Sequence, residues 1–169
     1  NGFGVITVTH PSALGSTAGG TIVNTAAKAR LELQGGLTLA EPLSFVGSSV
    51  DGTCLLSVSG SNTVSGMITT ASGRFVAYGG SVLNLAGGVT GVSDPQFVIN
   101  AGGTVVFSAT PVNLGASGLF WTDSGGLTVL GVAGNAWANT MVANGTLRTD
   151  VANALPTNST LQIGGITWA

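Results

Sequence analysis

The chain has 169 residues, enough for one domain with a sizeable core, but only 6% of them are charged, against about 25% in ordinary globular domains. The net charge is −2 and the few cations are dispersed, so the clustered basic patch that a nucleic-acid partner requires is missing. Glycines and polar residues interrupt every apolar run well short of the ~18 residues of a membrane helix, so we do not expect a membrane-spanning protein.

Short segments in which apolar and polar residues alternate recur along the chain, and this period of two predicts β-strands. The 28 glycines disfavour long helices, because each interior Gly costs roughly 1 kcal/mol relative to Ala. Gly, Asn, Asp, Ser or Pro separate most of the segments, as turns require. In chain order, the predicted strands cover residues 5–9, 29–33, 37–39, 43–46, 55–58, 74–78, 81–85, 104–107, 127–130, 146–148 and 160–163.

The spacing of these strands is compatible with an antiparallel sandwich or barrel and with a solenoid of short strands. Glycine pairs that precede four of the strands favour the solenoid, because they lie 44, 23 and 23 residues apart. This spacing predicts coils of about 22 to 23 residues, with one pair missing, and suits a three-faced β-helix whose coils stack on one another. The four pairs are Gly35-Gly36, Gly79-Gly80, Gly102-Gly103 and Gly125-Gly126.

We therefore predict that residues 1–169 form a single all-β module, a β-solenoid of short strands. The last residues, Gly164 to Ala169, look like a further strand unit rather than a polar cap. An uncapped solenoid end exposes strand edges and apolar side chains. We expect the module to be a fragment or a subunit of a larger surface or fibre protein, with a second subunit or further sequence covering this end. The first residues lack an initiator Met and a charged segment, which indicates that any signal peptide has been removed.

Several segments resemble the autotransporter-associated β-strand repeat. In that repeat, a Gly-Thr-Leu phrase is followed by an Asn-Ala-Leu phrase, and the sequence has Gly145-Thr146-Leu147 followed by Asn153-Ala154-Leu155. Residues 29–45 and 56–68 are also similar to phrases of these proteins. At residues 135–139, Asn-Ala-Trp-Ala-Asn replaces the usual Asn-Thr-Tyr-Thr-Gly.

The resemblance implies a right-handed parallel β-helix. It also implies an extracellular location, in a protein secreted to the cell surface of a Gram-negative bacterium, where such proteins serve as adhesins or surface structures. No catalytic residues accompany the repeat, so the resemblance assigns none to this chain.

Residues that could carry catalysis are few. His10 is the only histidine and Cys54 the only cysteine, which are too few for a zinc site built from several His or Cys ligands. We interpret His10 as a turn residue and Cys54 as a buried, inert thiol. We expect no enzyme activity, no cofactor and no metal site.

Three aspartates leave open the alternative of a Ca²⁺ site or a catalytic carboxylate pair. Asp94, Asp123 and Asp150 lie 29 and 27 residues apart, so insertions could align them along one edge of the solenoid. Such a row could bind Ca²⁺ or form the carboxylate pair of a glycosidase. Each aspartate also lies in a turn-like context that its backbone hydrogen bonds alone explain, and we favour this structural interpretation.

Tryptophans are the candidate ligand or subunit contacts, at Trp121, Trp137 and Trp168. If Phe120 and Trp121 lie on a strand, they point to opposite faces, so one of them is exposed or covered by a loop or a partner. An exposed Trp could stack on a sugar ring or anchor a subunit contact, whereas the commoner role is packing in the core or under a loop.

The leading functional hypothesis is an extracellular structural module of a bacterial surface protein or self-assembling filament, which associates end to end or by strand addition. A glycan-binding adhesin module is the alternative, and a polysaccharide-cleaving β-helix enzyme is a third hypothesis.

Overall fold

The computed structural model describes residues 4–47, 52–71, 73–91, 96–99, 102–116 and 118–165, with the backbone alone for residues 96–99. The described chain is a parallel β-helix with three sheets, and its helical content is one 3₁₀ turn, η1 (Thr25–Ala27). The all-β solenoid predicted from the strand spacing is therefore confirmed.

Sheet A has eight strands and runs along the whole solenoid. Their order is β1 (Val5–Val8), β3 (Arg30–Gln34), β6 (Thr53–Ser59), β9 (Arg74–Ala77), β12 (Gln96–Ile99), β14 (Leu119–Asp123), β16 (Asn139–Val142) and β18 (Thr160–Ile163).

Sheets C and B form the other two faces. Sheet C has six strands, β4 (Thr38–Leu39), β7 (Ser61–Val64), β10 (Val82–Leu85), β13 (Thr104–Phe107), β15 (Leu127–Leu130) and β17 (Thr146–Thr149). Sheet B has four, β2 (Thr21–Asn24), β5 (Leu43–Val46), β8 (Ile68–Thr70) and β11 (Val89–Gly91).

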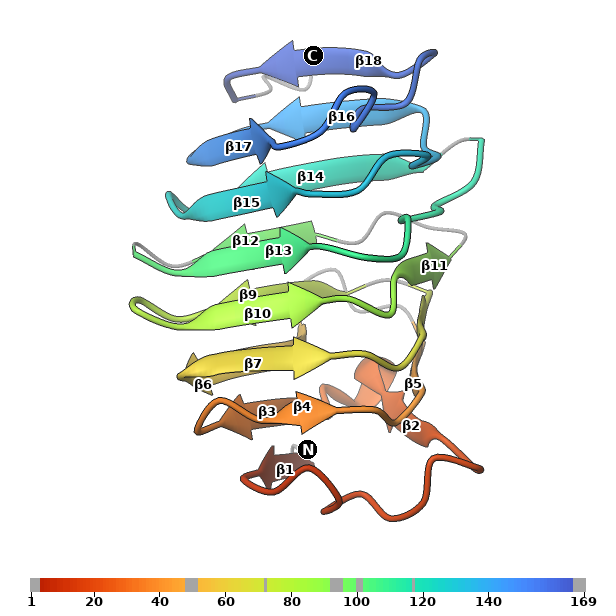
Figure 1. Cartoon of the computed structure of the whole chain (residues 1–169), viewed down its shortest axis with the longest axis vertical. Helices are drawn as coiled ribbons and strands as arrows, with labels where there is room; N and C mark the ends of the chain where they lie inside the picture. The colour runs from red at the N-terminus through yellow and green to blue at the C-terminus, as the bar shows by residue number, and fades with distance from the viewer. Residues whose placement is uncertain are drawn as a thin grey trace.

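The coils that begin at β3, β6 and β9 visit sheet A, then sheet C, then sheet B, and return to sheet A one level higher, whereas the coils that begin at β12, β14 and β16 have strands in sheets A and C only. In Figure 1 the chain climbs from the N-terminus at the bottom, with the sheet C strands in front pointing right and the sheet A strands behind pointing left. The coil is therefore right-handed, as the twist of parallel strands favours.

Inward side chains of successive coils stack directly on one another, because every strand pairing described is parallel and nearly in register. The clearest ladder lies on sheet A and extends from Ile6 to Ile163, so that 157 residues make seven coils of about 22 residues each. This agrees with the coil length predicted from the glycine pairs. The ladder consists of Ile6, Leu31, Leu55, Phe75, Thr122, Val142 and Ile163, and the backbone of Phe97 holds the register position between Phe75 and Thr122.

The glycine pairs lie at the corner where the chain passes from sheet A to sheet C. Hydrogen bonds join this corner between coils, for example from the Gly80 N–H to the Gly102 carbonyl at 2.8 Å. Between Gly35 and Gly79, where the spacing lacks one glycine pair, the single Gly60 occupies the corresponding corner with a φ of 75°. A Cβ at Gly60 would lie 2.6 Å from the backbone nitrogen of Gly36, so the corner leaves no room for a side chain there.

Buried asparagines form hydrogen bonds with backbone N–H and C=O groups that lie outside the strand pairings. Asn62 replaces an apolar residue in the interior ladder of sheet C, between Leu37 and Leu83. Its Oδ1 accepts hydrogen bonds from the backbone N–H groups of Gly36 and Leu37, and its Nδ2 donates to Ser57 Oγ at 2.8 Å. Because the Asn62 amide is hydrogen-bonded, its burial costs little free energy. Its bonds also hold the turn at Gly36 and Leu37 in place.

We predict that Gly66→Ala and Gly87→Ala each lower the free energy of unfolding by about 1 to 3 kcal/mol. A Cβ at Gly66 would collide with the carbonyl oxygen of Glu41, and a Cβ at Gly87 with that of Gly66, so the coils would have to move apart. Urea unfolding followed by circular dichroism measures the change. Gly19→Ala is the matched control, because nothing lies within 4 Å of a Cβ there, and equal losses in all three variants would contradict the prediction.

We also predict that Thr128→Val raises the free energy of unfolding by about 1 kcal/mol or more. The Thr128 side chain is buried in the sheet C ladder between Val105 and Leu147, and its hydroxyl has no hydrogen-bond partner among the described residues. The same denaturation assay checks this. Thr146→Val, at an exposed outward position, should leave stability within about 0.5 kcal/mol of the parent, and a destabilised Thr128→Val would refute the reasoning.

Candidate functional site

Trp137 belongs to the core and does not form an exposed aromatic surface. Only 4% of the residue is exposed. Its indole stacks on the Phe120 ring, with centroids 4.5 Å apart and an interplanar angle of 20°. The indole N–H donates to Thr140 Oγ1 at 2.7 Å. The structure therefore places Trp137 in the core-packing role rather than as an open platform for a sugar ring.

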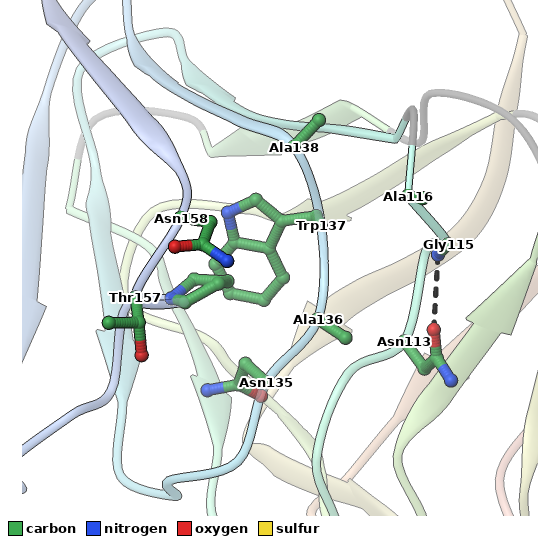
Figure 2. Close-up of a pocket in the computed structure, with 10 residues that line it drawn as sticks. Asn113, Gly115, Ala116, Asn135, Ala136, Trp137, Ala138, Thr157 and Asn158 are labelled. Atoms are coloured by element: carbon green, nitrogen blue, oxygen red, sulfur yellow. Dashed lines mark hydrogen bonds between the residues drawn. The ribbon is translucent and has the colours of Figure 1, made fainter.

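A shallow groove of about 460 Å³ runs beside Trp137. Figure 2 shows the indole between the segment that carries Asn135 and Ala138 and the segment of Thr157 and Asn158. The residues that line it are uncharged, and they are Asn113, Gly115, Ala116, Asn135, Ala136, Trp137, Ala138, Pro156, Thr157 and Asn158.

Several side-chain polar atoms of the groove already have partners. Asn113 Oδ1 accepts from the Gly115 N–H at 3.0 Å. Asn135 Oδ1 accepts from the Val112 N–H, and its Nδ2 donates to the carbonyls of Val132 and Ala154 at 2.8 and 2.7 Å. Asn135 therefore links three successive coils, and its amide is not available for a ligand.

Trp121 lies on the outer surface of sheet A, and its neighbour Phe120 is fully buried inside. The opposite orientation of these two residues is confirmed. Trp121 is half-buried between the register positions of Gln96 and Met141. Its indole N–H is buried and has no hydrogen-bond partner among the described residues, which makes it an unsatisfied donor. Trp168, the third candidate, lies outside the described residues.

The aspartates do not form one row. Asp123 ends β14 on sheet A, and its Oδ1 accepts from the Ser124 N–H at 2.6 Å. Asp150 follows β17 on sheet C and forms a bidentate ion pair with Arg148 at 2.7 and 2.9 Å. Asp94 lies outside the described residues. Within the described part of the chain, no cluster of three His, Cys, Asp or Glu could hold a metal ion.

His10 and Cys54 both fit their structural interpretations. His10 lies in an exposed turn after β1, and its Nδ1 accepts from the Ser12 N–H at 3.2 Å. Cys54 is fully buried, and its Sγ lies 3.2 Å from the Arg74 carbonyl oxygen. Burial raises the pKa of the Cys54 thiol far above its usual value, so the nucleophilic thiolate does not form near neutral pH.

The two ends of the sheet A ladder are the largest departure from a closed core. Ile6 is 54% exposed and Ile163 is 78% exposed, whereas Leu31, one coil above Ile6, is 1% exposed. The outer edges of β1 and β18 pair with no other described strand. The uncapped end that the sequence predicts, residues 164–169, lies mostly outside the described residues, which include only Gly164 and Gly165 of it.

No family model, curated protein or solved structure matches the chain. No helix in the described part of the chain has the length and apolar character needed to cross a membrane.

We predict that Cys54 does not react with a thiol reagent such as 5,5′-dithiobis-(2-nitrobenzoic acid) while the protein is folded at pH 8. Because burial raises the thiol pKa, the reactive thiolate is suppressed at this pH and appears only on unfolding. Absorbance at the thionitrobenzoate band, with and without denaturant, measures the reaction. Rapid release of one equivalent of thionitrobenzoate from the native chain would show that Cys54 is accessible and would contradict the prediction.

Proposed function

We propose that the chain is an extracellular structural module that assembles with other copies through the open ends of its solenoid. The observation that supports this most directly is the exposure of Ile6 and Ile163 on a ladder whose other members with described burial are largely buried. Each of these two side chains occupies an interior position, and among the described residues it has a neighbouring coil on one side only.

The edge strands carry none of the devices that usually keep an edge from pairing. Natural edge strands are protected by charged residues, prolines or bulges. The sequence of β1 is Val-Ile-Thr-Val and that of β18 is Thr-Leu-Gln-Ile, so neither contains a charge or a proline. A low overall charge also removes the repulsion that keeps proteins apart in solution.

The size of the apolar contribution indicates how strong this association can be. Burying one Ile side chain contributes about 1.5 to 3 kcal/mol. Two such residues together contribute roughly 3 to 6 kcal/mol, which is comparable to the lower estimates of the entropy cost of association, about 4 to 15 kcal/mol. Backbone hydrogen bonds between the edge strands must supply the rest, so we expect association to depend on concentration.

The location and family also belong to this proposal. Resemblance to the autotransporter-associated β-strand repeat supports a secreted surface protein of a Gram-negative bacterium. The right-handed parallel β-helix agrees with that resemblance but is compatible with other families and roles. The absence of catalysis likewise remains a prediction.

Glycan binding remains the alternative, and among the described residues it depends on Trp121. Trp137 is packed in the core, and the amide of Asn135 in the groove beside it is already hydrogen-bonded within the chain. A polysaccharide-cleaving enzyme has less support, because Asp123 and Asp150 lie on different sheets.

We predict that Ile163→Asp and Ile6→Asp each weaken self-association at least tenfold. A carboxylate at either position would have to be buried without a partner in the interface. Sedimentation velocity over a range of concentrations measures the association, and circular dichroism confirms that the variants remain folded.

Ile22→Asp is the matched control for these variants. Ile22 is 73% exposed, similar to Ile163, but it lies on the outer surface of sheet B rather than on the interior ladder. Its replacement should leave association unchanged. A parent chain that stays monomeric at high concentration would reject the proposed function.

A further inference from the structure

We propose that Asn144 is the site of a spontaneous covalent modification, in which its side-chain amide is lost and an aspartyl or isoaspartyl residue forms at the corner between β16 and β17. Asparagine is among the thermolabile residues of proteins. The reaction needs only the neighbouring peptide nitrogen and water. It is confined to one chain, so it does not depend on the proposed self-association.

The chemistry has two balanced steps. The backbone nitrogen of Gly145 attacks the side-chain carbonyl carbon of Asn144, and the C–N bond that forms closes a succinimide ring. The amide nitrogen leaves as ammonia and takes the proton of the Gly145 N–H. Water then opens the ring. Cleavage of the new C–N bond gives aspartate, whereas cleavage of the original peptide bond gives isoaspartate, whose main chain runs through the β-carbon.

The corner leaves the reacting groups open. Asn144 and Gly145 are both exposed, so water reaches them. Within the described part of the chain, neither the Asn144 amide nor the Gly145 N–H has a hydrogen-bond partner, so no bond has to be broken before the attack. Gly145 also lacks a Cβ that would crowd its nitrogen.

Stacking of the coils requires a glycine after Asn144. Gly145 has a φ of 101°, and a Cβ there would lie 2.8 Å from the carbonyl oxygen of Gly126 in the coil below. The Thr146 N–H donates to that same carbonyl at 2.9 Å and so joins the two coils. The fold therefore maintains the glycine of this reactive Asn-Gly sequence, whereas the Asn144 side chain contributes no hydrogen bond to it.

The corner between β6 and β7 provides a matched comparison. Ser61 and Thr146 belong to the same outward row of sheet C. The residues that precede them are therefore equivalent, Ser59-Gly60 in one coil and Asn144-Gly145 in the other, and both glycines have a positive φ. Because serine has no amide to lose, Asn144→Ser removes the reaction with a residue that the same corner geometry already accepts.

Formation of isoaspartate loosens β17. The extra main-chain carbon lengthens the turn directly before Thr146, whose N–H bond to Gly126 fixes the start of the strand. Leu147, the half-buried inward residue of β17, packs against the core and loses part of this contact when the strand shifts. The aspartyl product keeps the normal main chain, so it leaves β17 in place.

The test is ageing of the folded protein at mildly alkaline pH, followed by peptide mass spectrometry and labelling with protein isoaspartyl methyltransferase. Asn144 should convert first and account for most of the ammonia released. Asn158 is the internal control because it is also exposed. It should convert at least about tenfold more slowly, since Ser159 has a Cβ and its N–H already donates to the Pro156 carbonyl at 3.0 Å.

Two variants separate the reaction from its effect on stability. Aged Asn144→Ser should keep its original urea midpoint, whereas the midpoint of the aged parent should fall as isoaspartate accumulates. Freshly purified Asn144→Asp carries the charge of the product on a normal main chain and should unfold at the parent's midpoint.

Equal conversion of Asn144 and Asn158, or conversion of Asn144 only in denaturant, would overturn the proposal, because the folded corner would then not favour the reaction. Conversion without a fall in the urea midpoint would refute the loosening of β17. Neither result depends on whether copies of the chain associate, so the proposed function is tested separately by sedimentation.

Discussion

Stacking of each interior side chain between its neighbours one coil below and one coil above is the interaction on which this structure depends. No coil contains a core of its own, because its inward residues form only a thin layer. Leu31 and Leu55 are fully buried because the chain passes above and below them, whereas Ile6 and Ile163, on the same ladder, are largely exposed. Stability therefore increases with the number of stacked coils, and the ends are the weak points of the fold.

The corners between sheets impose the second constraint. Stacked coils are only as far apart as neighbouring β-strands, so their backbones lie close together at the corners. Gly66 and Gly87 lie where the backbone of one coil contacts the carbonyl of the coil below, and a methyl group there would separate them. Asn62 and Asn135 act differently, since their amides bond backbone groups that turn away from the sheets. The high glycine content and the scarcity of charge both follow from a fold that is mostly turns and stacked strands.

The same constraint connects the fold to its proposed role. Of the described acids, Asp123 accepts a hydrogen bond from the backbone of its own turn and Asp150 forms an ion pair with Arg148. What remains distinctive is the pair of open edges at β1 and β18, where unprotected strands and interior isoleucines are exposed. Addition of a further coil would cover both features at once.

The sequence alone determined the strand class and the coil length, because alternation and glycine spacing are periodic properties, and the apolar run around Cys54 predicted its burial. It located β5, β13, β15 and β18 at their observed bounds. It missed β12, β14 and β16 of sheet A. It also missed β7 and most of sheet B, where Thr, Ser and Asn stand on strands that are only three or four residues long. Only the tertiary structure decided that Asn62 faces inward, that Trp137 stacks on Phe120, and that Asp123 and Asp150 lie on different sheets. These outcomes depend on which coils become neighbours. The residues in contact are about 20 positions apart in the sequence, and because the coils vary in length, no local sequence pattern predicts such contacts.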